Sequence, residues 1–299
     1  MRSWQSFLVE CLLKLTRNKF DPGPYLAKKK IENQAPYVLP TKLQRKYGIL
    51  KSNRYSIDTY LLKSPAEPNQ RQILFLPGGG YTEQPLMWHW RFLHRLAQQL
   101  NGTITVPIYP KAPTYDYKET FAQVLPIYKD LLTKTSPDRI VIMGDSAGGG
   151  LTLALSQLIL CEGLPQPGNI ILLSPWLDVS LSHPEVAAMD RKEPMLNLQL
   201  LIESGKAYAG KSSTNDYLVS PINGPLQGLG NISLFIGTHE FFLPDARRLK
   251  ARADREKVAI NYYEYPKMNH VFPVFPIPEA KRAMRQIIDI ITHDRPRHP

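Results

Sequence analysis

Short apolar runs alternate with stretches of helical periodicity from about residue 55 onward. Helix-like patterns lie at 119–134 and 146–163, and a last one opens at Pro278 with apolar residues on one side. The strand-like runs are short and largely apolar and lie at 71–77, 103–110, 138–144, 169–175, 231–237 and 259–266, with 103–110 rich in β-branched residues. This alternation predicts an α/β protein with a mostly parallel central sheet flanked by helices.

The alternation is interrupted at two places. A polar, Pro-containing helical segment occupies 176–225, and we interpret it as an insertion over the sheet. Near the N-terminus, six apolar residues share one face of an amphipathic helix: Trp4, Phe7, Leu8, Cys11, Leu12 and Leu15. We expect this face to pack on the protein itself; the alternative is peripheral contact with a lipid surface, which Lys14, Arg17 and Lys19 would favour.

Composition narrows the class of protein. A chain of 299 residues with 43% apolar and 21% charged residues fits a folded α/β domain, and no run approaches the roughly 20 apolar residues that span a bilayer. Its net charge of +11 comes from scattered Lys and Arg, so we interpret it as a solvated basic surface and not as a nucleic-acid site. Cys11 and Cys161 lie in apolar settings, and Glu10 interrupts the N-terminal apolar run. We therefore expect a cytoplasmic protein with no signal peptide.

The strongest chemical motif is Gly144-Asp145-Ser146-Ala147-Gly148, which fits G-x-S-x-G where a buried strand runs into a helix. A serine becomes a useful nucleophile when small neighbours let it project from a tight turn toward a base. The alternative is a structural Gly-rich turn whose serine only caps the following helix, because such a turn can have the same sequence. The position between strand and helix favours Ser146 as the nucleophile.

A glycine run, Gly78-Gly79-Gly80, follows the first buried strand. Glycine lets the backbone approach a ligand and offer N–H groups to an oxyanion. The alternative interpretations of this glycine run are a flexible turn and a phosphate-binding loop. The Lys-Ser/Thr pair that follows the glycines in a phosphate-binding loop is missing here. The glycine run and the later serine turn together favour acyl transfer.

A base and an acid should follow the serine in the chain. His270 comes after the last strand, whereas four other histidines do not: His89, His94, His183 and His239. For the acid, Glu240 follows the strand at 231–237. Asp245 is the alternative, but it suits the first turn of the next helix.

Through residues 70–290 the chain resembles the hormone-sensitive-lipase-like family of α/β-hydrolase carboxylesterases. The resemblance rests on ordered motifs: GGG (78–80), VPIYPKAPTYDYKETF (106–121), GDSAGG (144–149), SPWLD (174–178), GTHEFFLPD (237–245) and KMNHVF (267–272). It implies that Ser146 attacks an ester carbonyl, His270 transfers the proton and Glu240 orients the imidazole. It also implies that the backbone N–H groups of Gly79, Gly80 and Ala147 bind the oxyanion, with no metal or other cofactor.

The resemblance further implies one α/β-hydrolase domain over 1–299, capped by elements at about 1–45 and 176–225. Three positions depart from the family pattern. Pro77 stands where a loop-bracing His is usual, Glu240 stands where Asp is usual, and Val271 stands where Gly is common. We expect Pro77 to remove a bracing hydrogen bond and Val271 to narrow the pocket.

The function predicted from these observations is a serine carboxylesterase acting on small-molecule esters with short-to-medium acyl groups. The same three residues would also serve an amide hydrolase, a deacetylase or a lipase. A catalytically silent protein that binds a small ligand is the alternative from another class. Self-association stays open, because edge strands and the final helix are candidate dimer surfaces.

Overall fold

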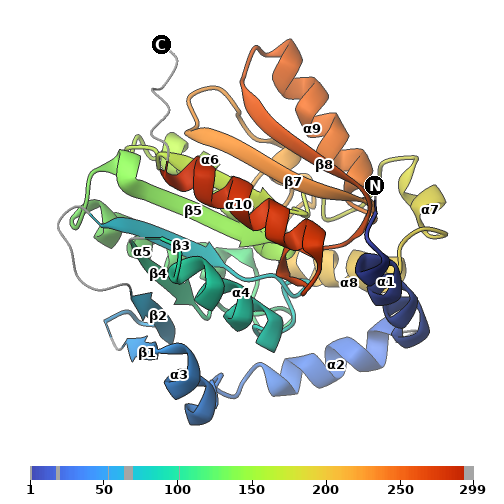
Figure 1. The fold of residues 1–299 in the computed structure, drawn as a ribbon, viewed down its shortest axis with the longest axis horizontal. Helices are drawn as coiled ribbons and strands as arrows, with labels where there is room; N and C mark the ends of the chain where they lie inside the picture. Colours follow the sequence, from blue (N-terminus) through green and yellow to red (C-terminus); the bar gives the residue numbers. More distant parts are fainter. Residues whose placement is uncertain (1, 18–20, 53, 64–69, 101, 293–299) are drawn as a thin grey trace.

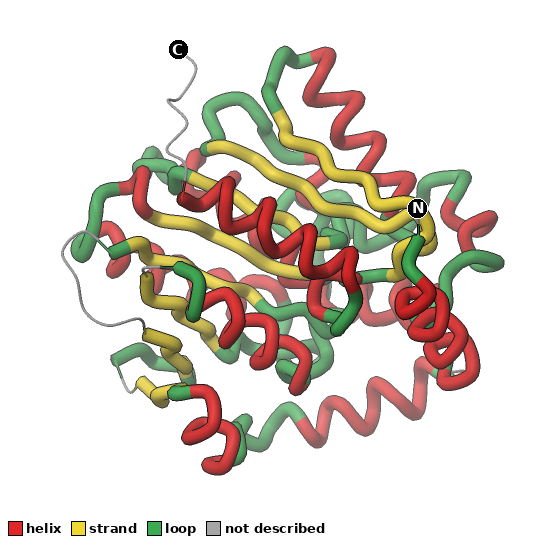
Figure 2. The backbone as a smooth tube through the Cα atoms, in the orientation of Figure 1, coloured by secondary structure: helices red, strands yellow, loops and turns green. Residues whose placement is uncertain are grey.

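A computed structural model describes residues 2–17, 21–52, 54–63, 70–100 and 102–292. Its described strands form one sheet in the order β1-β2-β4-β3-β5-β6-β7-β8 (Figures 1 and 2). Their bounds are β1 (Ile49–Ser52), β2 (Thr59–Lys63), β3 (Arg71–Leu76), β4 (Gly102–Pro107), β5 (Ile140–Asp145), β6 (Asn169–Leu173), β7 (Asn231–His239) and β8 (Ile260–Asn269).

The prediction of a mostly parallel sheet is confirmed. The six predicted strands correspond to β3 through β8, and neighbouring strands in this group pair in parallel. Sequence reasoning missed β1 and β2, two short strands that extend the β4 edge. β2 runs antiparallel to both of its neighbours.

Alternation along the strands creates two apolar faces. Ile73 and Phe75 of β3 belong to one core, whereas Leu74 and Leu76 belong to the other. The first core is covered by α4 (Met87–Ala97) and α10 (Pro278–Thr292). The second is covered by α5 (Tyr117–Leu132), α6 (Ala147–Cys161) and α9 (Leu243–Arg255). The parallel strands are therefore buried on both sides, which explains their continuous apolar sequences.

Two groups of helices lie outside this three-layer core. The chain begins with α1 (Trp4–Thr16), α2 (Pro22–Glu32) and α3 (Thr41–Tyr47), and the segment after β6 contributes α7 (Val186–Met189) and α8 (Leu198–Ala209). α2 contacts α8, while α1 lies beside the beginning of α10 (Figure 1). Segments far apart in the sequence thus meet at one end of the sheet.

The N-terminal helix forms as predicted, but the expectation that its apolar face packs on the protein is wrong. Trp4, Phe7, Leu8, Leu12 and Leu15 are between 49% and 83% exposed. The polar side chains of Ser6 and Glu10 are the buried ones.

Polar contacts explain this inverted orientation. Glu10 makes ion pairs with Arg2 and Lys14 and contacts His239 at 3.0 Å. Glu279 at the start of α10 accepts hydrogen bonds from the backbone N–H and the hydroxyl of Ser3. A buried carboxylate needs such partners, so these contacts decide which side of α1 faces inward. No helix among the described residues has the length and apolar character needed to cross a bilayer.

Candidate active site

Ser146 occupies a sharp turn between β5 and α6, as the G-x-S-x-G pattern predicts. Its φ of 54° and ψ of −124° are unusual for a residue with a side chain, and such strain persists where the surroundings enforce it. The flanking glycines are required sterically. A Cβ at Gly148 would lie 1.9 Å from the carbonyl oxygen of Leu76, and one at Gly144 would lie 2.3 Å from that of Gly148.

Three side chains distant in sequence form a hydrogen-bonded relay at this turn. His270 Nε2 lies 2.9 Å from Ser146 Oγ, and His270 Nδ1 lies 2.8 Å from Glu240 Oε2. Glu240 follows β7 and His270 follows β8, so both project from the same end of the sheet as Ser146. Glu240 is fully buried and His270 is 2% exposed, which protects the relay from competing water.

The acid is held from its other side. Glu240 Oε1 accepts hydrogen bonds from the hydroxyl of Ser174, at 2.8 Å, and from the backbone N–H of Gly237, at 2.7 Å. The Ser174 hydroxyl also accepts the N–H of Val271 at 3.0 Å, next to the histidine. From the sequence, Ser174 enters only as part of the SPWLD motif, and its hydrogen bond to Glu240 is not predicted. A serine at the end of the neighbouring strand β6 was the available signal.

Electrostatics at the site favour a protonatable imidazole. Burial by itself would lower the pKa of His270, but the hydrogen bond and negative charge of Glu240 outweigh it and raise the pKa. Glu193 and Asp145 add negative charge in the same direction. Glu193 is buried, and burial raises its own pKa to about 6. The surroundings of His270 therefore favour the protonated form of its imidazole.

The rival acid, Asp245, does not join the relay. It lies in the first turn of α9, 1% exposed, with neither carboxylate oxygen hydrogen-bonded. Burial and the negative charge of Asp178 raise its pKa to about 7, and Arg248, 3.9 Å away, offsets this only in part.

The glycine loop lies against the serine turn. Gly79 and Gly80 have φ values of 125° and 58°, which favour glycine, and both line the same cleft as Ser146. Ala147 is the first residue of α6, where backbone N–H groups lack intrahelical acceptors. The three expected oxyanion donors thus belong to segments that meet at Ser146.

Pro77 does not leave this loop unbraced. The Asp145 carboxylate accepts the N–H of Gly78 at 3.0 Å and contacts His89 Nε2 at 3.1 Å. Because His89 Nδ1 accepts the N–H of Leu86, Nε2 carries the hydrogen and donates to Asp145. The Tyr109 hydroxyl also donates to the Pro77 carbonyl at 2.6 Å. His89, set aside as a base, instead helps to hold the loop.

The cleft above Ser146 has a volume of about 410 Å³. Its walls come from the glycine loop, α2, α4, α8, the segment before α8 and the residues after His270. Met195, Leu196, Trp88 and His89 all line it, whereas Trp90 is buried in the core. Val271 lines the cleft with a left-handed φ of 51°.

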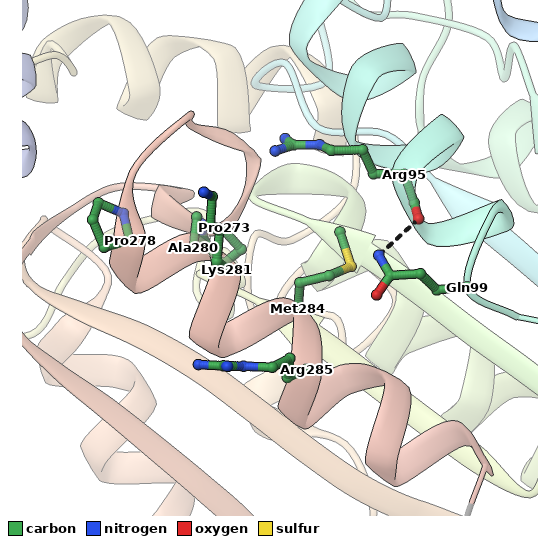
Figure 3. A pocket seen from close by; sticks show the side chains of 8 residues that line it. All are labelled: Arg95, Gln99, Pro273, Pro278, Ala280, Lys281, Met284 and Arg285. Atoms are coloured by element: carbon green, nitrogen blue, oxygen red, sulfur yellow. Dashed lines mark hydrogen bonds between the residues drawn. The ribbon is translucent and has the colours of Figure 1, made fainter.

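A second hollow, of about 500 Å³, lies between α4 and α10 and does not include Ser146. Figure 3 shows Arg95 and Arg285 extending on opposite sides of it. Its basic side chains do not converge on a common point, so it lacks the built polar centre of a ligand site.

These features define a hydrolase of α/β architecture, and comparison with known proteins agrees. Residues 73–274 match a family model described as α/β hydrolase fold, and the chain belongs to that family. It is a hydrolase of the carboxylesterase family.

An esterase of Acinetobacter venetianus is 29% identical over 232 residues, which cover 76% of this chain and 77% of the relative. An acetyl-hydrolase of Streptomyces hygroscopicus is 28% identical over 225 residues, covering 74% and 75% of the two chains. Among solved structures, a Staphylococcus aureus protein proposed to be an esterase is 30% identical with a TM-score of 0.87, covering 93% and 94%.

A hormone-sensitive lipase from a metagenome library is 26% identical with a TM-score of 0.77, covering 92% and 98% of the two chains. Together with the family match, this bears out the resemblance to hormone-sensitive-lipase-like esterases.

Proposed function

We propose that the protein is a serine carboxylesterase that hydrolyses short-to-medium acyl esters through an acyl-serine intermediate. The observation that carries this proposal is the relay from Ser146 through His270 to Glu240 at the floor of a cleft. A hydroxyl 2.9 Å from a histidine nitrogen is within reach for proton transfer, and the second nitrogen is oriented by a buried carboxylate.

The mechanism follows from these roles. Ser146 Oγ attacks the ester carbonyl while His270 Nε2 takes its proton, and the N–H groups of Gly79, Gly80 and Ala147 stabilise the developing oxyanion. His270 then protonates the departing alcohol. Water activated by the same imidazole attacks the acyl-serine and releases the acid. Glu240 stabilises the imidazolium in both steps.

The preference for shorter acyl groups is supported by the cleft and by the relatives. Met195, Leu200, Leu201 and Val274 supply apolar walls within a space of about 410 Å³. Val271 adds a β-branched side chain beside His270. The names of two relatives, an esterase and an acetyl-hydrolase, are consistent with ester cleavage and a small acyl group.

We also propose that one hydrolase domain spans the chain and that the segments at about 1–45 and 176–225 cap the cleft. Tyr25 of α2 and Leu200 of α8 both line it, which supports a contribution from each segment. A cytoplasmic location is supported by the two free cysteines. Cys161 is exposed, and an exposed thiol stays reduced more readily in the cytosol than in an oxidising compartment.

The test is hydrolysis of p-nitrophenyl esters from acetyl to palmitoyl by the wild type and by Ser146→Ala. We expect rates highest on short chains and a loss of several orders of magnitude in the variant. Ser156→Ala is a matched control, because Ser156 is a buried serine of α6 outside the cleft. A maximum on long chains would favour a lipase, and preferential cleavage of p-nitroacetanilide would favour an amide hydrolase. Equal rates for wild type and Ser146→Ala would remove Ser146 from the mechanism.

A further inference from the structure

The N-terminal helix presents an apolar surface that the fold does not cover. We define the outer face of α1 as Trp4, Phe7, Leu8, Leu12 and Leu15. The opposite side is attached to the protein, since Val9 and Leu13 pack against the core and Ser6 and Glu10 are buried. A helix with apolar residues on one side and fixed polar contacts on the other resembles helices that lie on a lipid interface.

The exposed apolar side chains are concentrated in the same part of the chain. Eleven large apolar side chains are exposed in the described residues, and eight of them lie between Trp4 and Leu50. Ile31 and Val38 are each more than 70% exposed, although they belong to other parts of this segment. The five residues of the outer face of α1 lie on one side of a single helix, and such a grouping marks an interaction surface more often than scattered single residues do.

The positive charge of residues 1–52 favours an anionic partner for this surface. Lys and Arg are scattered along the whole sequence, but acidic residues are scarce near the N-terminus: residues 1–52 contain eleven basic and three acidic side chains, a net charge of +8, whereas the rest of the chain carries +3. Lys19 is among these basic residues but lies outside the described part of the structure. On α1 itself, Lys14 pairs with Glu10 and Arg17 with Asp190. Lys28 of α2 lies 3.4 Å from Glu32, so the surplus comes largely from Lys30, Lys42, Arg45 and Lys46 on the following helices.

We propose that the outer face of α1 docks the protein on an anionic lipid surface. Apolar side chains of α1 would enter the interface while the cations of α2 and α3 attract anionic headgroups. A second copy of the chain is a poorer partner, because a two-fold contact would press one positively charged segment against another.

Docking would also place the cleft close to the membrane. Arg17 at the end of α1 donates to the carbonyl of Leu196, and Leu196 lines the cleft. Leu86 and Trp88, which also line the cleft, are themselves exposed. This surface is independent of the acyl chemistry proposed above, so the two can fail separately.

The test is binding to vesicles of 30% phosphatidylglycerol and 70% phosphatidylcholine, followed by flotation and by tryptophan fluorescence. We expect binding at least about tenfold tighter than to pure phosphatidylcholine and weakened by salt. The blue shift of the tryptophan fluorescence on binding should be smaller in Trp4→Phe than in the wild type. The triple variant Phe7→Gln, Leu8→Gln, Leu12→Gln should bind at least about tenfold more weakly. It should still hydrolyse a soluble p-nitrophenyl ester at the wild-type rate, which also shows that it is folded.

Tyr115→Gln is the matched control, since Tyr115 is exposed but lies outside the N-terminal segment and the cleft. It should bind vesicles like the wild type. Ser146→Ala should also bind normally, which separates docking from hydrolysis. Absence of vesicle binding, or equal binding by the triple variant, would overturn the proposal. So would a wild-type dimer that becomes monomeric in the triple variant, because a second copy would then cover the outer face.

Discussion

Asp245→Asn separates the rival acid from the relay and tests an unusual electrostatic feature of the fold. Burial and Asp178 raise the pKa of Asp245 to about 7 from an ordinary value of 3.8. The folded protein therefore holds a proton on this group over a pH range in which the unfolded chain has released it. Stability from this group must fall as the pH rises, because the folded state binds more protons.

The two pKa values set the size of the effect. Between pH 5 and pH 8, linkage predicts a loss of stability on the order of 2–3 kcal/mol from Asp245 alone. In Asp245→Asn the same position is neutral at every pH, so this contribution disappears. Other groups, including His270 and Glu193, titrate in both proteins and cancel in the comparison.

The assay is urea unfolding of wild type and variant at pH 5 and pH 8, with hydrolysis measured in parallel. We expect the variant to gain stability relative to the wild type as the pH rises and to keep most of its kcat. An unchanged stability difference at the two pH values would refute the electrostatic reasoning. A loss of activity in Asp245→Asn, with Glu240→Gln still active, would refute the assignment of Glu240 as the acid.

Three other predictions follow from specific contacts. Glu240→Gln should lower kcat roughly 10³- to 10⁴-fold. Glu240 raises the pKa of His270, so the variant should have a lower His270 pKa. Because His270 must be neutral to act as a base, the residual activity should extend to lower pH in a pH–rate profile. Ser174→Ala removes a donor to Glu240 and leaves the buried Val271 N–H unpaired, which should cost about 1–3 kcal/mol in urea unfolding and reduce kcat. Gly148→Ala should destabilise the fold by about 3 kcal/mol or more, since its Cβ would lie 1.9 Å from the Leu76 oxygen. Gly23→Ala in α2 is the control: its nearest contact would be 3.7 Å, so the variant should be at least as stable as the wild type.

Local sequence patterns were sufficient for much of the fold. The six apolar runs became β3 through β8 because each run needs burial on both sides, and parallel strands covered by helices provide it. The short strands β1 and β2 escaped notice, since β1 has only four residues and one of them is buried. Their place at the edge of the sheet depends on the pairing of β2 with β4 and of β1 with β2, which a local pattern does not contain.

The residues of the candidate site that lie in tight turns could be predicted from the sequence. Ser146 and the glycine run stand out because glycines recur there. A Cβ would lie under 3.0 Å from a neighbouring atom at Gly78, Gly79, Gly144 and Gly148, and Gly80 has a φ of 58° that favours glycine. The contacts that support them were not predictable. Ser174 and His89 look like ordinary polar residues in the sequence. The folded chain brings Ser174 to Glu240 and His89 to Asp145 from distant positions in the sequence.

The N-terminal helix marks the division between the two levels most plainly. The sequence by itself determined that α1 is a helix with one apolar side, because the spacing of apolar residues follows the helical period. Only the tertiary structure decided which side faces inward. Glu10 meets Arg2, Lys14 and His239, and Ser3 meets Glu279 from the opposite end of the chain. Periodicity records only the spacing of residues along one helix, whereas the orientation of that helix depends on partners supplied by the rest of the fold.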